Sequence, residues 1–255
     1  MSKICVLTPT RNRPHLLEMS KVCLVNQTIP KENLTWIILD NSDEGNEGWT
    51  KATEITDVRV VYTRIPPGKP LGELRNICIE TGLRECPDAD FFAFWDDDDY
   101  YMPKRFENQI RAMGLNPQAS LCICREMEVF LTRENILMKV GPYPEHQGTC
   151  ASYFVRRNYI EKNRFDASAT KGEETSFCRK WTAKTVSLPP KDVLLVIGHP
   201  KNTVDKSQVY TNQRQFMADV VNQDNGKNII RYKWIQSQPV WDLFYKTFLA
   251  ADEDL

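Results

Sequence analysis

Four consecutive aspartates, Asp96 to Asp99, are the residues of this sequence best suited to chemistry. Carboxylates crowded together raise one another's pKa unless a cation neutralises them, so the run indicates a bound divalent metal. Magnesium, manganese and calcium all bind carboxylate and phosphate oxygens, and magnesium typically uses one or two protein carboxylates together with substrate phosphates. The run therefore predicts a site for a hard cation and a phosphate-bearing ligand.

A calcium loop of the EF-hand type is one alternative interpretation of this run. Asp96, Asp98 and Glu107 fall at the first, third and twelfth positions of such a loop. Tyr100 and Tyr101, however, occupy the fifth and sixth positions, where the loop needs an oxygen ligand and a turn-making glycine. The sequence therefore disfavours an EF-hand.

A solvated acidic turn and a phosphatase are two further alternatives. Charge runs are usually exposed, but the apolar residues 91–95 directly before the aspartates predict a buried strand, and ligands of parallel sheets bind beyond strand ends. A phosphatase nucleophile would usually lie on the first strand. Here that strand ends in Thr8, Pro9 and Thr10. Both alternatives are weaker than a metal site.

The elements that position the aspartates alternate between short apolar strands and helical patterns, which is typical of parallel βα units. We expect strands over residues 4–8, 35–40, 58–62 and 91–95, and helices over 14–26, 69–84 and from 103 to about 113. Asp40 and the aspartate run both follow strands, at the edge where ligands bind. The pattern predicts an α/β fold with a mostly parallel central sheet flanked by helices.

The second half of the chain is less repetitive. We expect a mixed β region through residues 121–131, a helix starting near Glu173, a strand over 193–198 and aromatic-rich helices over 208–249. Residues 1–206 are predicted to form one catalytic domain, with a donor half of about 1–125 and an acceptor half of about 126–206. Residues 207–255 are predicted to be a helical extension packed on it.

Composition excludes several classes of protein. With 255 residues, 41% hydrophobic and 26% charged, the chain is typical of a globular domain, and a net charge of -1 gives no reason to expect a nucleic acid partner. There is no transmembrane run, and the amino terminus has no signal-peptide core, so a cytoplasmic location is expected. The 8 cysteines are scattered and form no CxxC pair, which disfavours a zinc site.

Several segments taken together resemble a known family. They are residues 6–14 (VLTPTRNRP), 37–42 (IILDNS), 72–76 (GELRN) and 94–99 (FWDDDD). Their order and spacing resemble the inverting glycosyltransferases of family 2, which have the GT-A fold, over roughly residues 3 to 125. The resemblance implies a nucleotide-sugar donor, with a uridine diphosphate sugar as the commonest choice, and a Mn²⁺ or Mg²⁺ cofactor.

The resemblance also assigns residues to the donor. The loop of Thr8, Pro9, Thr10, Arg11 and Arg13 would hold the nucleotide, and Asp40 would accept hydrogen bonds from its base, as an acceptor-only carboxylate can. Arg11, Arg13 or Arg75 could approach the pyrophosphate. Instead of binding the donor, Asp40 could stabilise a turn. Arg75 could instead form a surface ion pair.

Within the aspartate run, the family's DXD pattern maps onto residues 96–98. Asp96 would face the ribose and Asp98 the metal, with Asp97 on the donor side. Asp99 could replace or assist Asp98, because four identical residues leave the register open by one position. His199, which follows a strand, corresponds to a histidine that family members often bring to the metal, and neutral imidazole is a competent ligand.

The acceptor needs a general base, because its hydroxyl must lose a proton as it attacks the anomeric carbon. Glu173 and Glu174 resemble the family's acidic pair before a helix, in which the second carboxylate is commonly the base. The family usually has aspartate at that second position, so the choice between Glu173 and Glu174 stays open. Their alternative role is to stabilise a helix amino terminus.

The sequence thus predicts a metal-dependent inverting glycosyltransferase acting on a glycan or another hydroxyl acceptor. A sugar nucleotidyltransferase is an alternative, although the glycine-rich phosphate loop that would favour it is lacking. A non-catalytic sugar-nucleotide-binding protein of the same fold is the other alternative. Large aromatic residues toward the carboxyl terminus are expected to pack on the sheet rather than bind the acceptor.

Overall fold

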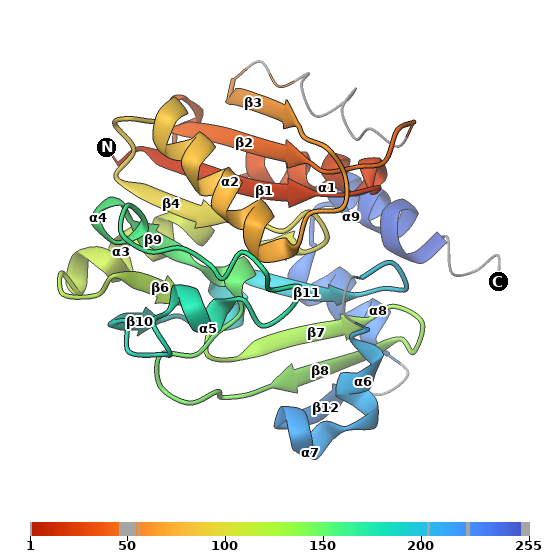
Figure 1. The fold of residues 1–255 in the computed structure, drawn as a ribbon. Helices are drawn as coiled ribbons and strands as arrows, with labels where there is room; N and C mark the ends of the chain where they lie inside the picture. Colours follow the sequence, from red (N-terminus) through yellow and green to blue (C-terminus); the bar gives the residue numbers. More distant parts are fainter. Residues whose placement is uncertain (1, 46–54, 56, 203–204, 223–224, 251–255) are drawn as a thin grey trace.

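Two β-sheets form the centre of the computed structural model, which describes residues 2–45, 55, 57–202, 205–222 and 225–250 (Figure 1). The larger sheet has seven strands in the order β10-β6-β9-β4-β1-β2-β3. Its strands are β1 (Ile4–Thr10), β2 (Leu34–Asp40), β3 (Arg59–Arg64), β4 (Phe91–Phe94), β6 (Leu121–Ile123), β9 (Phe154–Arg156) and β10 (Thr185–Ser187). The mixed α/β class predicted from the sequence is confirmed.

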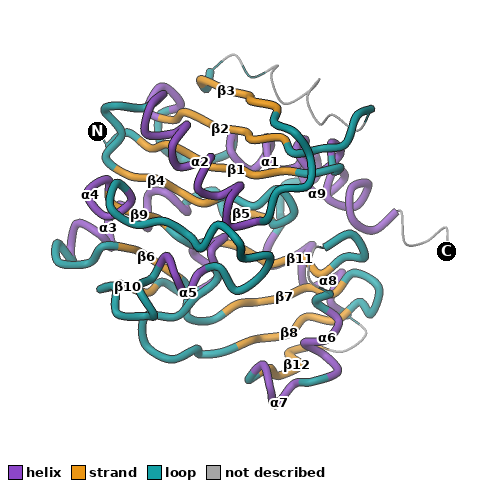
Figure 2. The backbone as a smooth tube through the Cα atoms, in the orientation of Figure 1, coloured by secondary structure: helices purple, strands orange, loops and turns teal. Residues whose placement is uncertain are grey.

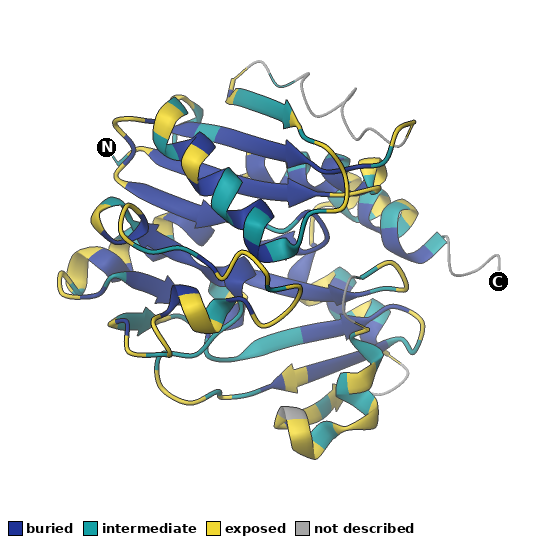
Figure 3. Cartoon of the chain, in the orientation of Figure 1, coloured by how far each residue is buried: buried dark blue, intermediate teal, exposed yellow. Residues whose placement is uncertain are grey.

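The amino-terminal strands of this sheet run in parallel. β1 lies between β2 and β4 and is parallel to both, with Thr10 opposite Asp40 and Leu7 opposite Phe94. Figure 3 shows these inner strands buried along almost their whole length, whereas β3 at the edge is partly exposed. The carboxyl ends of β1, β2 and β4 therefore meet at one edge, which is where the sequence places its polar residues.

Helices cover both faces of the parallel strands. Successive side chains of a strand point to opposite faces, and in β1 Ile4 and Val6 join one core cluster while Cys5 and Leu7 join the other. The first cluster includes residues of α1 and α3, and the second includes residues of α2, which lies over β1 and β2 in Figure 1. The helices are α1 (Pro14–Val25), α2 (Leu71–Glu85) and α3 (Arg105–Leu115).

The smaller sheet brings the end of a distant strand to the aspartates. Its order is β12-β8-β7-β11-β5, with β5 (Tyr100–Tyr101), β7 (Met127–Leu131), β8 (Ile136–Val140), β11 (Leu194–Gly198) and β12 (Ala218–Asn222). β5 directly follows the aspartate run and pairs antiparallel with β11 through Tyr101 and Leu194. The residues after β11 are thereby held beside the run.

The later part of the chain differs in detail from the sequence prediction. The helix expected near Glu173 is a single turn, α5 (Glu174–Phe177), within a mostly irregular stretch (Figure 2). The predicted helical extension contains a strand, β12, which pairs with β8. The other helical elements are α4 (Arg157–Ile160), α6 (Ser207–Thr211), α7 (Gln213–Phe216), α8 (Gly226–Ile229), α9 (Gln238–Phe244), the π-helical η4 (Ile230–Trp234) and η5 (Tyr245–Leu249), and the 3-10 turns η1 (Lys31–Asn33), η2 (Cys150–Ser152) and η3 (Pro190–Asp192).

Aromatic residues of the carboxyl-terminal helices pack into the protein core. Phe244 and Phe248 are buried in the main core cluster, and α9 contacts α1. Residues 251–255 of the predicted extension lie outside the described part of the chain. In that described part, no helix has the length and apolar character needed to cross a bilayer.

Candidate active site

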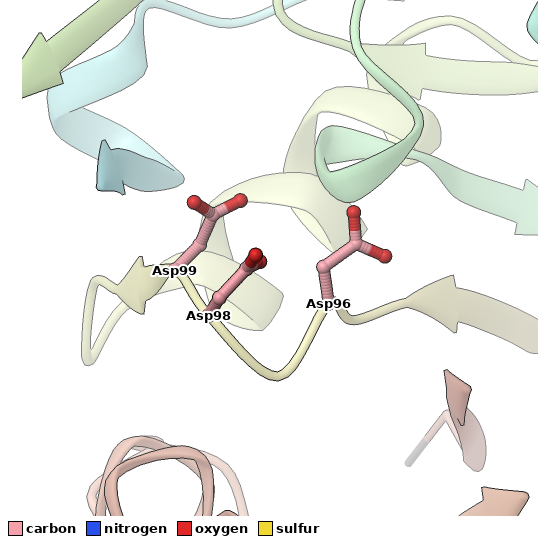
Figure 4. Close-up of side chains that lie close together, drawn as sticks. All are labelled: Asp96, Asp98 and Asp99. Carbon is pink, nitrogen blue, oxygen red and sulfur yellow. The ribbon is translucent and has the colours of Figure 1, made fainter. Parts of the chain in front are cut away.

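The loop after β4 presents three carboxyl groups to the same side (Figure 4). Each of Asp96, Asp98 and Asp99 offers an oxygen within 4.8 Å of those of the other two. Asp98 is only 8% exposed, and Asp97 and Asp99 are also buried. Because carboxylates are rarely buried without partners, this cluster needs compensating positive charge.

Two basic side chains supply part of that charge. Arg13, just before α1, bridges the run with Nη2 3.0 Å from Asp97 Oδ1 and Nη1 2.8 Å from Asp98 Oδ2. Lys206 places Nζ 3.7 Å from Asp99 Oδ1. The Thr10 hydroxyl, at the end of β1, donates to Asp97 Oδ2 at 2.6 Å. The cluster is therefore built from the ends of β1 and β4 and from the segment after β11.

His199 reaches the cluster from the end of β11. Its Nε2 lies 3.7 Å from Asp98 Oδ2, and this buried nitrogen has no hydrogen-bond partner among the described residues. The nearby Asn202 donates from Nδ2 to the same Asp98 oxygen at 3.0 Å. An imidazole nitrogen facing a carboxylate cluster without a hydrogen bond is suited to metal coordination.

The acids of the cluster differ in their protonation. Burial raises the pKa of Asp97 to about 7, although Arg13 opposes the shift. Burial also raises the pKa of Asp99 to about 7. Burial would raise the pKa of Asp98 as well, but Lys206 and the neighbouring His199 hold it well below its usual value. Of Asp97, Asp98 and Asp99, Asp98 therefore ionises most readily, and a cation that binds here would favour ionisation of the other two as well.

Arg75 joins the aspartates to the glutamate pair. It lies on α2, is 3% exposed, and places Nη1 2.9 Å from Asp96 Oδ1 and Nε 2.8 Å from Glu173 Oε1. The first turn of α2 can approach the segment before Glu173 because residue 72 is glycine: a Cβ there would lie 1.9 Å from the Asp166 carbonyl oxygen. Arg75 is thus a buried bridge rather than the surface ion pair that was its alternative.

Glu174, unlike Glu173, has no basic side chain as an ion-pair partner among the described residues. Its Oε1 accepts a hydrogen bond from the Cys150 backbone N–H at 3.3 Å. Burial, and next the charge of Glu173, raise the pKa of Glu174 to about 6. A carboxylate with such a pKa is mostly ionised at neutral pH and is a stronger base than an ordinary glutamate, which suits general-base catalysis.

One cavity of about 200 Å³ contains most of these groups, although Asp99 and His199 are not among the residues that line it. It is lined by acids from the loop after β4, by both glutamates, by four basic side chains and by other residues of the loop before α5: Pro9, Arg13, Leu71, Arg75, Asp96, Asp97, Asp98, Thr170, Lys171, Gly172, Glu173, Glu174, Asn202 and Lys206. Such a combination can hold an anionic group beside a cation and can place a base on another wall of the same cavity.

Comparison with known proteins identifies the family. A family model described as glycosyl transferase family 2 matches residues 5–171. The chain belongs to this family. No curated protein matches the sequence significantly. The family match covers nearly all of β1, which ends at Thr10, all of β2, which ends at Asp40, and β4 with the aspartate run that follows it. It reaches Lys171, just before the glutamate pair.

Solved structures share the GT-A fold of this family 2 chain at low sequence identity. S. aureus TarS has a TM-score of 0.57 at 13% identity, covering 99% of this chain and 50% of that one, so the chain spans half the length of TarS. A TarS fragment, residues 1–349, in complex with UDP-GlcNAc has a TM-score of 0.60 at 14% identity, covering 99% and 83%. The mannosyltransferase PcManGT from Pyrobaculum calidifontis, in complex with GDP-Man and Mn²⁺, has a TM-score of 0.58 at 12% identity, covering 97% and 70%.

The predicted donor residues of this family 2 chain are not all at the cavity. Pro9, Arg13 and Arg75 line it. Thr8 is buried beneath it and accepts a hydrogen bond from Trp36 Nε1 at 2.8 Å. Arg11 is largely exposed, 3.7 Å from a carboxylate oxygen of Asp43. The roles of Thr8 and Arg11 in donor binding stay predictions.

Asp40 has the contacts of a residue that stabilises a turn. It is fully buried; its Oδ1 accepts from the Ser42 backbone N–H at 2.9 Å, and its Oδ2 accepts from the Tyr62 hydroxyl at 2.6 Å. Both carboxylate oxygens are therefore engaged within the protein, as in the turn-stabilising alternative. A hydrogen bond between Asp40 and a nucleotide base stays a prediction.

Two residues at this family 2 site were missed from the sequence. Lys206 and Asn202 both contact the aspartates, yet they lie more than 100 residues further along the chain. The fourth position of the segment beginning at His199 is Asn202, so proximity to a candidate metal ligand was a usable signal for it. Lys206 carried no comparable signal, because a lysine in a polar segment is usually solvated.

Proposed function

We propose that this family 2 protein is a metal-dependent, inverting glycosyltransferase that moves a sugar from a nucleoside diphosphate sugar to a hydroxyl group. The observation that carries the proposal is the single cavity that is lined by the aspartates 96–98, by the basic side chains Arg13, Arg75 and Lys206, and by a glutamate of raised pKa, Glu174. The aspartates with their bound cation and the basic side chains would stabilise a phosphate-bearing leaving group. The glutamate would take the proton of a hydroxyl nucleophile.

The residues of the cluster fit a divalent cation. Asp96, Asp98 and Asp99 offer close carboxylate oxygens, and His199 offers a buried nitrogen that lacks a hydrogen bond within the described residues. We assign Asp98, Asp99 and His199 to Mn²⁺ or Mg²⁺, and Asp96 and Asp97 to the donor side. When bound, the cation would neutralise charge on the diphosphate.

The basic residues of the cavity would stabilise the departing diphosphate. Arg13 has a guanidinium that can bind phosphate oxygens in a bidentate manner, and Lys206 contributes a point charge. Arg75 is held between Asp96 and Glu173, so it orients both acids and contributes positive charge behind them. Because Arg75 and the aspartates that it and Arg13 contact are largely buried, these charges act more strongly than they would in solution.

Glu174 is the base in this proposal. As the acceptor oxygen forms a bond to the anomeric carbon, its proton passes to the Glu174 carboxylate. The bond between the anomeric carbon and the diphosphate oxygen breaks, and its electron pair leaves with the nucleoside diphosphate. Attack on the face opposite the leaving group inverts the anomeric configuration. Glu173 is committed to Arg75, which favours Glu174 over its neighbour.

The donor is proposed to be a uridine diphosphate sugar. Structures of the same fold are complexes with UDP, UDP-GlcNAc and GDP-Man, so a nucleoside diphosphate sugar suits the fold. We also propose that residues 1–125 hold the donor and that 126–206 hold the acceptor. The cavity supports this division for the acids, because its aspartates come from the first segment and its glutamates from the second. His199 and Lys206 are the exceptions, since they belong to the second segment and are assigned to the cation and the diphosphate.

Release of nucleoside diphosphate from a donor panel tests this function. We expect the purified protein to hydrolyse one of UDP-glucose, UDP-GlcNAc, UDP-galactose or GDP-mannose slowly in Mn²⁺, with water as acceptor, and to lose this activity on addition of EDTA. Restoring Mn²⁺ should restore the rate. A protein that binds a donor without releasing nucleotide would be a non-catalytic binding module. Formation of a nucleotide sugar from a sugar phosphate would indicate a nucleotidyltransferase.

The rate of transfer should depend on pH through Glu174. Its pKa of about 6 lies above that of an ordinary glutamate, and the base must be ionised to accept a proton. We therefore expect kcat to rise about tenfold per pH unit below pH 6 and to level off above it. The profile should be measured at saturating Mn²⁺, because Asp97 and Asp99 have pKa values of about 7. A flat profile from pH 4.5 to 7 would contradict the assignment.

A further inference from the structure

A second cavity, of about 260 Å³, lies on the other side of Glu174. It is lined by two aromatic side chains, a thioether, an amide, a hydroxyl and a glycine: Met127, Tyr143, Gln147, Gly148, Thr149, Glu174 and Trp181. Among the residues that line it, Glu174 alone also lines the cavity of the aspartates. The proposed base therefore stands between two cavities of different character.

The wall formed by Tyr143 is fixed by its backbone. The Tyr143 N–H donates to the Arg125 carbonyl at 2.7 Å, and the Arg125 guanidinium donates back to the Tyr143 carbonyl from Nε at 2.9 Å and Nη2 at 2.7 Å. The Tyr143 hydroxyl makes no hydrogen bond within the described part of the chain. Burial, and next the charge of Glu174, raise the pKa of Tyr143, so its hydroxyl keeps its proton and can donate to a ligand.

Gly148, which also lines the cavity, is held in place by close contacts. A Cβ at position 148 would lie 2.5 Å from the Cys124 carbonyl oxygen, so only glycine allows this close approach. The Gly148 carbonyl accepts a hydrogen bond from the buried Tyr153 hydroxyl at 2.9 Å. Gln147 and Thr149, on either side, bring an amide and a hydroxyl to the cavity. These groups can exchange hydrogen bonds with hydroxyl groups of a ligand.

Trp181 reaches the cavity from a strained turn. Arg179, Lys180 and Trp181 have φ values of 52°, 53° and 65°, which cost non-glycine residues roughly 1–2 kcal/mol each. The turn is held by hydrogen bonds from the Lys180 N–H to the Thr175 carbonyl at 2.8 Å and from the Thr182 N–H to the Cys178 carbonyl at 3.1 Å. Backbone strain of this kind persists where surrounding contacts hold it, and it clusters at active sites and ligand-binding segments.

We propose that this cavity is the acceptor subsite and that it binds one uncharged sugar ring, stacked on Trp181 and Tyr143. The proposal rests on the proposed function. Aromatic faces bind the apolar C–H face of a sugar ring, while the hydroxyl groups at its rim need polar partners such as Gln147 and Thr149. None of the described lining residues carries a positive charge, which disfavours a phosphorylated group in this position.

The size and place of the cavity support the same ligand. At about 260 Å³ it is somewhat smaller than the roughly 300–1,000 Å³ of typical sites for drug-sized molecules, so it suits a single ring. A hydroxyl of that ring would face Glu174, which is the position from which its proton passes to the carboxylate and its oxygen attacks the anomeric carbon.

Binding of simple glycosides to the complete chain tests the subsite without requiring transfer. We expect methyl glycosides of glucose, mannose, galactose or N-acetylglucosamine to give saturation-transfer NMR signals with the wild-type protein. Trp181→Ala should weaken the binding of the responding glycoside about tenfold, a loss of the size expected for an aromatic stacking partner. Trp181→Phe, which keeps an aromatic face, should recover most of the affinity. Tyr232→Ala, which removes an aromatic side chain that is 71% exposed, is the matched control and should bind normally.

The outcomes separate this proposal from the proposed function. Glycoside binding that depends on Trp181 supports the subsite even if every nucleotide sugar is left intact. Donor hydrolysis without binding of any glycoside overturns the subsite and leaves the function standing. Binding of glycerol 3-phosphate in place of the glycosides would overturn the choice of an uncharged ring. If the protein also transfers to the responding glycoside, Trp181→Ala should raise the acceptor KM about tenfold and change the donor KM much less.

Discussion

Asp98→Asn is expected to lower sugar transfer at least about 10²-fold, in line with the loss of one strong electrostatic group from an active site. Asp98 is the member of the cluster whose pKa is held well below its usual value, chiefly by Lys206 and His199. It also faces His199 and Arg13. Because Asp98 is one of the three clustered carboxylates that could hold a cation, the same variant should bind Mn²⁺ more weakly.

The fold should survive this substitution. Asparagine has nearly the same shape as aspartate, and the negative charge of Asp98 is one cause of the raised pKa of Asp97 and Asp99. When that charge is removed, these two acids ionise more readily and continue to neutralise Arg13 and Lys206. We therefore expect only a small change in melting temperature.

Mn²⁺ titration followed by electron paramagnetic resonance measures the binding directly, and nucleotide release measures the activity. Asp88→Asn is the matched control, because Asp88 is exposed and pairs only with Lys3 among the described side chains. It should bind Mn²⁺ as the wild type does. If Asp98→Asn kept full activity and full Mn²⁺ affinity, Asp98 would have to be abandoned as the metal ligand.

The parts of this site that were predictable from the sequence are those set by local pattern. An apolar strand that runs into acids places Asp96 to Asp99 at a sheet edge, whatever the rest of the fold does. The same argument placed Asp40 at the end of β2, opposite Thr10. The parallel direction of the amino-terminal strands and the edge that carries the chemistry follow from the alternation of strands and helices. The order of the strands in the sheet was not predicted.

The parts that were not predictable depend on contacts between distant segments. Lys206 reaches Asp99 because β5 pairs with β11, and β5 is only two residues long, too short to be recognised as a strand. The sequence left two roles open for Arg75, binding of the pyrophosphate and a surface ion pair. Its burial between Asp96 and Glu173 depends on the close approach that Gly72 allows.

The helix expected near Glu173 is a second feature that the sequence did not predict correctly. Apolar residues at helical spacing, Phe177 and Trp181, suggested a continuous helix. In the structure the helix ends at Phe177, and Trp181 lies in a left-handed turn beside the second cavity. Side-chain periodicity predicts a helix only where the backbone can continue, and three consecutive residues with positive φ cannot be recognised from their side chains.

Glu174→Gln is expected to reduce kcat by about 10²–10⁴-fold, the usual contribution of a general base. Glutamine keeps the shape of the side chain and can still accept the Cys150 N–H hydrogen bond, but it cannot take a proton from the acceptor. The KM for the donor and the affinity for Mn²⁺ should change little, because Glu174 contacts neither Arg75 nor the aspartates through an ion pair in the described chain. The rise of kcat through pH 6 should disappear with the base.

Glu173→Gln is the matched comparison, since it makes the same chemical change one residue away. Glu173 is paired with Arg75 inside the protein, and removing one partner of a buried ion pair costs about 3–5 kcal/mol. Because Asp96 still pairs with Arg75, the loss of folding free energy should lie at the lower end of this range. It should appear as a fall in melting temperature. The remaining folded enzyme should keep the pH dependence of the wild type. If instead Glu173→Gln abolished that pH dependence while Glu174→Gln preserved it, the base would be Glu173. The cavity lined by Tyr143 and Trp181 would then no longer be supported as the acceptor subsite.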